Sequence, residues 1–199
     1  ITTANGSLQW TASSGSDPFI RSIGSGQQSL EFNTGGDERL RIDSDGRLLL
    51  NNISSRSIAN VTAKVQLEGT SADGSAISIT RNSASVSPPY LNFGKSRATS
   101  TGGTTIIQNG DNLGEIRFSG ADGNDLTNHA ARINAEIDGN VGINSTPGRL
   151  IFSTTPASGT DPIERLRIRS NGVMSAKRSD GASLELLRNT ATTGTTDVL

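Results

Sequence analysis

The chain has 199 residues, and Ser, Thr, Asn and Gly together make up 87 of them. Only 32% of the residues are hydrophobic and 4% are aromatic, so one chain offers little material for a core of its own. The 18 Lys and Arg residues nearly balance the 19 Asp and Glu residues, which argues against nucleic acid and membrane surfaces as partners. There is no Cys for a disulfide or a thiolate zinc site, and no apolar run approaches the roughly 20 residues that span a bilayer.

A triplet of an aliphatic residue, any residue and an aromatic residue occurs five times along the chain, and we expect a strand at each triplet. The triplets hold four of the five Phe residues and the only Trp. Aromatic side chains bury the most area per residue, so their confinement to one slot predicts equivalent layers of a repeated core. The triplets are residues 8–10, 30–32, 91–93, 116–118 and 150–152.

A longer box follows the triplet at residues 38–46 and returns at residues 164–172, with seven of nine positions identical. Within it Leu40 and Ile42 alternate with Arg39 and Arg41, which is the period of a half-buried strand, with Leu and Ile on one face and Arg on the other. A second box, at residues 73–82, returns at residues 180–189. The order of the boxes predicts repeat units, with 1–42 ending a first unit, 43–169 a full unit and 170–199 the start of a truncated one.

The stretch 128–138 alternates in the same way, since Ala131, Ile133, Ala135 and Ile137 are separated by polar residues, and we expect a strand there rather than a helix. Asn-Gly and Asp-Gly pairs between the strands are typical hairpin turns. They are Asp45-Gly46, Asp73-Gly74, Asn109-Gly110, Asp122-Gly123, Asp138-Gly139, Asn171-Gly172 and Asp180-Gly181.

These patterns predict an all-β fold of short strands and tight turns in repeated units, arranged as a meander. Because one chain cannot bury enough apolar surface, we expect an elongated fibrous homotrimer. Its apolar side chains, including Phe32, Phe93, Phe118 and Phe152, would pack toward the trimer axis or between neighbouring sheets.

At residues 114–123, 139–144, 147–155 and 164–172 the sequence resembles tail fibres and related appendage proteins of tailed bacteriophages, particularly those of marine bacteria and cyanobacteria. The resemblance is dense over residues 91–172. It implies a β-rich homotrimer on the virion, outside the host cell, that serves attachment to the host surface. Because a unit repeated within one chain builds length, we expect a shaft or shaft-proximal module. The implied partners are other copies of the chain, other virion proteins and a host surface glycan or protein. A polysaccharide-degrading tail spike and a capsid or neck decoration remain the alternatives.

The candidate sites each have a simpler explanation. Asp43 and Asp45 resemble the opening of a calcium loop, but Arg169 replaces the first ligand in the second copy and the twelfth position is Ser54, so a hairpin turn is favoured. His129 is the only His, which leaves no His cluster for a metal.

A glycosidase needs two acids about 5 to 9 Å apart. Turn and surface roles explain the available candidates, which are Glu115, Asp122, Asp125, Glu136 and Asp138, so we expect no enzyme and no cofactor. For the Arg residues of the repeated box we expect cross-strand ion pairs on an exposed face rather than phosphate binding. For receptor contact the candidates are the segment 87–90, with Tyr90, and the loop 98–105; for Tyr90 we expect packing beside the strand 91–93 instead.

Overall fold

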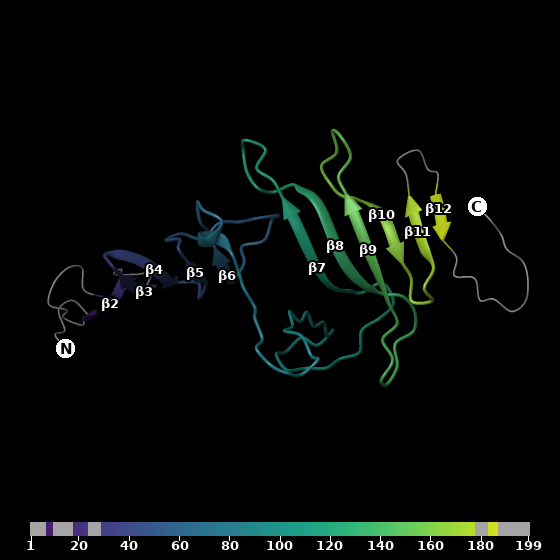
Figure 1. Cartoon of the computed structure of the whole chain (residues 1–199), viewed down its shortest axis with the longest axis horizontal. Helices are drawn as coiled ribbons and strands as arrows, with labels where there is room; N and C mark the ends of the chain where they lie inside the picture. Colours follow the sequence, from purple (N-terminus) through teal and green to yellow (C-terminus); the bar gives the residue numbers. More distant parts are fainter. Residues whose placement is uncertain (1–6, 10–17, 24–28, 178–182, 187–199) are drawn as a thin grey trace, which may run out of the picture. The chain divides into compact units, whose positions relative to one another are not determined.

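The computed structural model describes residues 7–9, 18–23, 29–177 and 183–186, and it confirms the all-β prediction (Figure 1). Apart from one turn of 3-10 helix, η1 (Asp73–Ser75), the regular structure of these residues consists of strands in two sheets. The chain divides into two compact units, Ile1–Tyr90 and Leu91–Leu199. Each sheet belongs to one unit.

The sheet of the first unit follows chain order from β1 to β6. Neighbouring strands are antiparallel, except that β5 and β6 are parallel. The strands are β1 (Ser7–Gln9), β2 (Phe19–Ile23), β3 (Ser29–Thr34), β4 (Asp37–Ile42), β5 (Leu48–Leu50) and β6 (Val65–Leu67).

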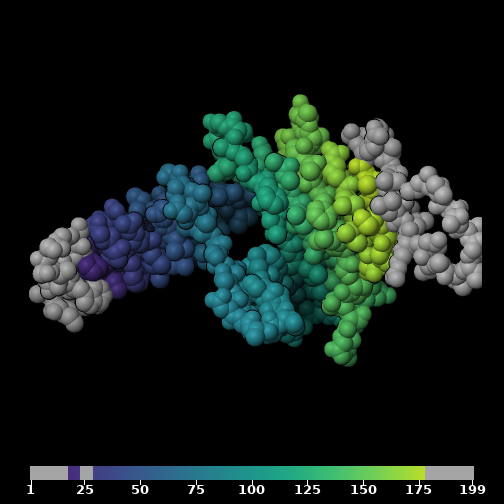
Figure 2. All heavy atoms as spheres, in the orientation of Figure 1, coloured from purple at the N-terminus to yellow at the C-terminus, as the bar shows by residue number. Residues whose placement is uncertain are grey.

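The sheet of the second unit is an antiparallel meander, as expected. The predicted strand over 128–138 is confirmed as β8 (His129–Ile137). Loops 120–128 and 155–162 project beyond one end of the sheet and loop 139–147 beyond the other, and the strand side chains form one continuous face (Figure 2). The other strands are β7 (Asn112–Ser119), β9 (Gly148–Thr154), β10 (Ile163–Ile168), β11 (Met174–Lys177) and β12 (Ser183–Leu186).

The two copies of the Glu-Arg-Leu-Arg-Ile box form strands β4 and β10 with the same local pairing. Leu40 lies opposite Phe32 in the first unit, and Leu166 lies opposite Phe152 in the second. In both strands the register then shifts by one residue, which leaves Arg39 and Arg165 as the extra residues of a β-bulge.

The bulge corrects the expectation that all the Arg side chains of the box share one face. Because Arg39 is the bulged residue, Glu38 takes its place beside Arg41, and Arg41 Nε donates to Glu38 Oε1 at 2.7 Å. Arg39 instead bonds the exposed Asp37. The second copy repeats the pattern, since Arg167 pairs with Glu164 while Arg165 Nε bonds Thr154 Oγ1 at 3.0 Å.

The turns after the two boxes are also alike. Gly46 has a φ of 68° and Gly172 a φ of 82°, and the backbone nitrogen of each donates to the carbonyl three residues earlier at 2.9 Å. The left-handed conformation explains the Gly at each position. A turn that the sequence analysis missed joins β3 to β4 through Gly35 and Gly36 alone.

Three expected elements differ. Asp73-Gly74 lies in η1 rather than in a hairpin, and residues 76–82 and 91–93 form no strand. A strand needs a neighbour for its backbone hydrogen bonds, and in the described part of the chain no strand pairs with these segments in a sheet. Asp180-Gly181 lies outside the described residues, as does Trp10, although residues 183–186 of the second copy form β12.

The burial of the two faces is the opposite of what a single-chain core would show. In the first unit Glu31 is only 1% exposed, between Arg21 and Arg41 on the neighbouring strands. Arg21 Nε donates to Glu31 Oε2 at 2.8 Å, and Arg41 bonds the other oxygen. Buried carboxylates need such partners, so this cluster secures β2, β3 and β4 in register.

We therefore expect Glu31→Gln to lower the free energy of unfolding by about 2 kcal/mol, because two arginines lose a buried counter-charge while remaining partly solvated. Urea denaturation followed by circular dichroism measures this. Asp37→Asn is the matched control, since the Asp37–Arg39 pair is exposed and its loss should change the stability by less than about 0.5 kcal/mol. If the two variants lowered the free energy of unfolding equally, the stabilising role of Glu31 between Arg21 and Arg41 would be contradicted.

Candidate functional site

The second sheet presents an apolar face that its own chain leaves largely uncovered. The register aligns Ile116, Ile133, Phe152 and Leu166 in one row across β7 to β10. Phe118 is 51% exposed and Ile116 44% exposed at the β7 side of this face. Contiguous apolar surface of this kind marks an interaction site.

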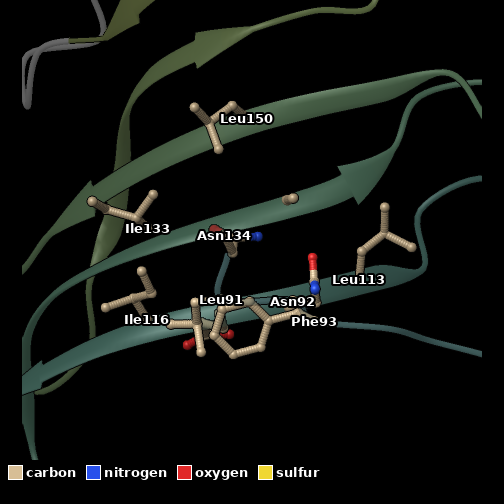
Figure 3. Close-up of a pocket in the computed structure, with 11 residues that line it drawn as sticks. Leu91, Asn92, Phe93, Leu113, Ile116, Ile133, Asn134 and Leu150 are labelled. Carbon is tan, nitrogen blue, oxygen red and sulfur yellow. The ribbon is translucent and has the colours of Figure 1, made fainter. Parts of the chain in front are cut away.

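A groove of about 400 Å³ lies on this face (Figure 3). Leu91 and Phe93, from the segment before β7, lie beside Ile116, while Ile133 and Leu150 line the groove from β8 and β9. Gly114 makes the crossing possible, because a Cβ at that position would lie 2.7 Å from the Cβ of Phe93. The groove is therefore bounded by a strand and a chain segment that only a glycine allows to approach.

The first sheet repeats the arrangement. Leu30 lies opposite Ile42, and Ile42 lies opposite Leu48, which in turn is paired with Val65. Leu30, Ile42 and Val65 are all exposed, although Leu49, on the opposite face, is fully buried. Both sheets thus offer an open apolar face and a better covered polar face.

The polar face of the second sheet is covered by ion pairs. Arg149 Nη2 lies 2.7 Å from Glu136 Oε2, and its Nη1 lies 3.0 Å from Asp138 Oδ1. Asp138 also accepts the backbone N–H of Ser170 at 2.9 Å, and this bond, with Arg149, lowers the pKa of Asp138. This cross-strand pair lies outside the repeated box. Within the box, Arg41 forms the expected cross-strand pair, with Glu31, but at a largely buried site rather than on an exposed face, while Arg39 and Arg167 pair within their own strands.

On the same sheet, Glu164 is held by Arg167 and Lys177. Burial alone would raise the pKa of Glu164, but the hydrogen bonds from these two cations outweigh it and lower the pKa. The carboxylate is therefore kept ionised by its neighbours, which is a structural role.

The five carboxylates considered for glycoside cleavage have similar roles. Glu136 and Asp138 share Arg149, and Glu115 binds Arg117 on its own strand at 2.8 Å. Asp122 accepts the backbone N–H groups of Asn124 and Asp125, which lowers its pKa and shapes the loop 120–128. Asp125 in turn accepts the N–H of Thr127. Only Glu115 among the five lines the groove.

The Asp43 turn is a hairpin turn in the structure. Asp43 Oδ1 accepts the N–H groups of Asp45 and Arg47, and Arg47 Nη1 lies 3.1 Å from Asp43 Oδ2. Burial raises the pKa of Asp43, but the bonds from Arg47 outweigh this and lower it. His129 is the first residue of β8, and its backbone carbonyl accepts a hydrogen bond from the Thr155 hydroxyl. The described residues contain no group of three or more metal-binding side chains.

Neither receptor-contact candidate is among the residues that line the groove. Tyr90 is 62% exposed, which corrects the expectation that it packs beside a strand at 91–93, because that strand is absent. The loop 98–105 is held at its base, where Arg97 donates to both oxygens of Asp111 at 2.7 Å each.

Sequence reasoning missed the groove and the Arg97–Asp111 pair. The available signal for the groove was Gly114, since a glycine inside an alternating strand often marks the close approach of another segment. For the ion pair there was no signal, because its partners lie 14 residues apart and are brought together only by the return of the chain.

No helix in the described ranges is long and apolar enough to cross a membrane. No protein-family model matches the chain, and no curated protein does.

The chain is similar to solved structures of a phage tail-fibre domain. One is the carboxy-terminal domain of the bacteriophage T5 L-shaped tail fibre, with 15% identity and a TM-score of 0.64 over 97% of this chain and 88% of that chain. Another is the same domain with its intramolecular chaperone domain, with 15% identity and a TM-score of 0.66 over 98% of this chain and 61% of that one. At this identity the likeness shows the fold.

We expect Asp111→Asn to release the base of the loop 98–105. The Arg97 backbone N–H, which bonds Thr105 O, should then exchange with solvent several times faster in hydrogen-exchange NMR. Asp125→Asn, in a different loop, should leave that rate unchanged.

The same contact should weaken in acid. Arg97 holds the pKa of Asp111 far below its usual value, so the stabilisation is complete above the unfolded-state pKa of about 3.9 and is lost as the pH falls toward the lower folded value. Protection of the Arg97 amide that fails to decline below about pH 4 would contradict this assignment.

Proposed function

We propose that the chain is a structural segment of a phage tail fibre, a shaft or shaft-proximal module that supports attachment of the virion to the host cell surface. The likeness of its fold to a tail-fibre domain supports this, together with the phage-fibre motifs at residues 114–123 and 164–172. The observation that carries the proposal is the exposure of the apolar faces of both sheets.

Those faces support assembly into an elongated homotrimer. Fully burying a side chain such as Ile116, Phe118 or Val65 is worth about 1.5–3 kcal/mol, and one chain leaves each of them exposed. A second and third copy offer the same apolar faces, so closed symmetry lets every copy cover another.

Repetition supports the shaft assignment. The two boxes form strands with the same register, the same bulge and the same turn, which is how a repeated unit would extend a fibre. Our division into 1–42, 43–169 and 170–199 follows the boxes and stays a prediction, because the compact units of the chain are defined by contact and not by recurrence.

The proposed partners are other copies of the chain and other structural proteins of the virion. The proposed location of the segment is the surface of the virion, outside the host cell. The role is not enzymatic, since each candidate carboxylate serves a cation or a turn. A host glycan or protein would bind at the receptor-binding tip of the fibre. If this segment also touches the host surface, the exposed Tyr90 and the exposed loop 98–105 are the groups that would make the contact.

We expect Phe118→Asp to prevent trimer formation, because it places a charge on the apolar face. Multi-angle light scattering should give three times the chain mass for the unchanged protein and a lower mass for the variant. Ile143→Asp is the control: Ile143 is 97% exposed in a turn away from the sheet, and its replacement should leave the mass unchanged.

A monomeric unchanged protein at micromolar concentration would overturn the homotrimer. So would a Phe118→Asp variant that assembles as well as Ile143→Asp.

We expect the purified trimer, added in excess to host cells before infection, to leave phage adsorption unchanged, because a shaft projects the receptor-binding tip without binding the receptor. Counting unadsorbed phage measures this. Blocked adsorption would contradict the shaft assignment and place receptor binding in this segment.

The same preparation separates the alternatives. Release of reducing ends from host glycan that disappears in Glu136→Gln or Asp122→Asn would identify a polysaccharide-degrading spike. Labelling of the segment at the capsid or neck in virion images would identify a decoration fibre.

A further inference from the structure

Residues 76–80 have the sequence of a strand but no strand neighbour in the described chain. Ile77 and Ile79 alternate with Ser78 and Thr80, as in a half-buried strand. Ile77 is nevertheless 80% exposed, and Ile79 is exposed as well. The segment offers two apolar side chains and a row of backbone groups that pair with nothing in a sheet.

The second copy of this box shows what the sequence forms when a neighbour is present. Residues 183–186 are β12, which pairs with β11, so that position 184 lies opposite Ala176 and position 186 opposite Met174. By the alignment of the boxes, these two positions correspond to Ile77 and Ile79. The box is therefore able to form a strand within this fold.

In the first unit the corresponding place is occupied. The strand equivalent to β11 is β5, and β6 already pairs with the edge of β5 that β4 leaves open. The first copy has 19 more residues between its boxes than the second, and β6 lies in the longer connection. Residues 76–80 are consequently displaced from the edge that their counterparts use.

An open edge of suitable length exists on β7. β7 is an edge strand of the second sheet: β8 pairs with one side of it, and within the described ranges no strand pairs with the other side. β7 has eight residues, whereas β6, an edge strand of the first sheet, has only three. The exposed Ile116 and Phe118 lie along it, so a strand added there with its Ile residues on the same face would extend and cover the apolar surface.

We propose that residues 76–80 of one copy add as a strand to the outer edge of β7 of a second copy. This rests on the proposed homotrimer and names a strand exchange within it. The occupant is another copy because every copy contains both the segment and the edge, and neither of them has a strand partner among the described residues. Edge strands with exposed apolar side chains pair readily with a further chain.

Cysteine pairing tests the contact directly, because the natural chain contains no Cys. One tagged copy would carry Ile77→Cys or Ile79→Cys, and a differently tagged copy Ile116→Cys or Phe118→Cys. After co-assembly and mild oxidation, at least one of the four combinations should give a disulfide between the two tags on a non-reducing gel, since side chains opposite each other on adjacent strands lie within disulfide reach. Val86→Cys, fully exposed later in the same segment, should give none with either β7 position.

The outcomes separate this inference from the homotrimer. A trimer in light scattering without any of the four disulfides overturns the strand exchange and leaves the trimer standing. A monomer overturns both. A disulfide that forms only between two copies of Ile79→Cys, and never with β7, assigns the segment to a contact with itself and also overturns the proposal.

A backbone test that needs no cysteine compares Ser78→Pro with Ile79→Pro. Successive N–H groups of a strand point to opposite sides, and an edge strand accepts proline only where the N–H faces solvent, so at least one of the two trimers should melt several degrees lower. Ala84→Pro, in the same exposed segment beyond the alternation, is the matched control. Melting temperatures of both variants equal to that of Ala84→Pro would overturn the proposal.

Discussion

A sheet whose strands alternate apolar and polar side chains has one apolar face, and that face is stable only beneath a second layer. Each unit of this chain provides one sheet and no second layer among its described residues. Phe118, Ile42 and Val65 show the result, since all three remain exposed. At about 1.5–3 kcal/mol for each such side chain, covering both faces contributes as much as the entire stability of an ordinary domain, about 5–15 kcal/mol.

The ion pairs on the opposite faces act differently from a core. A partly exposed pair such as Arg149 with Glu136 contributes about 0–1 kcal/mol, so the pairs do not replace the missing layer. They instead penalise a wrong register, because a shift of one residue would turn Glu31 to the apolar face and separate it from Arg21 and Arg41. The ion pairs select the register, and the free energy available for further stabilisation lies in the apolar surface that remains exposed.

How far the sequence predicts this protein depends on how local each feature is. The alternation over β8 and in the two boxes is local, and those strands were predicted correctly. The bulge at Arg39 was not, because a strict period of two places Arg39 and Arg41 on the same face and nothing in the sequence marks the extra residue. Residues 91–93 alternate like a strand, but strand formation depends on a neighbour that no local pattern specifies. Among the candidate sites, the Asp43 turn was predicted from its Gly, whereas the groove arises from the way Phe93 crosses Gly114.

The turn of Gly35 and Gly36 has a kinetic consequence. Strands β4 and β10 are so alike that either could pair with β3 or with β9, and an exchange of partners would keep the rows of apolar side chains and the bulge intact. Two residues separate β3 from β4, while eight separate β9 from β10. Short connections close first, and a hairpin forms within about 1–10 μs, so β4 is engaged before a distant competitor arrives. In a chain with duplicated strands, the order of loop closure decides which strand meets which.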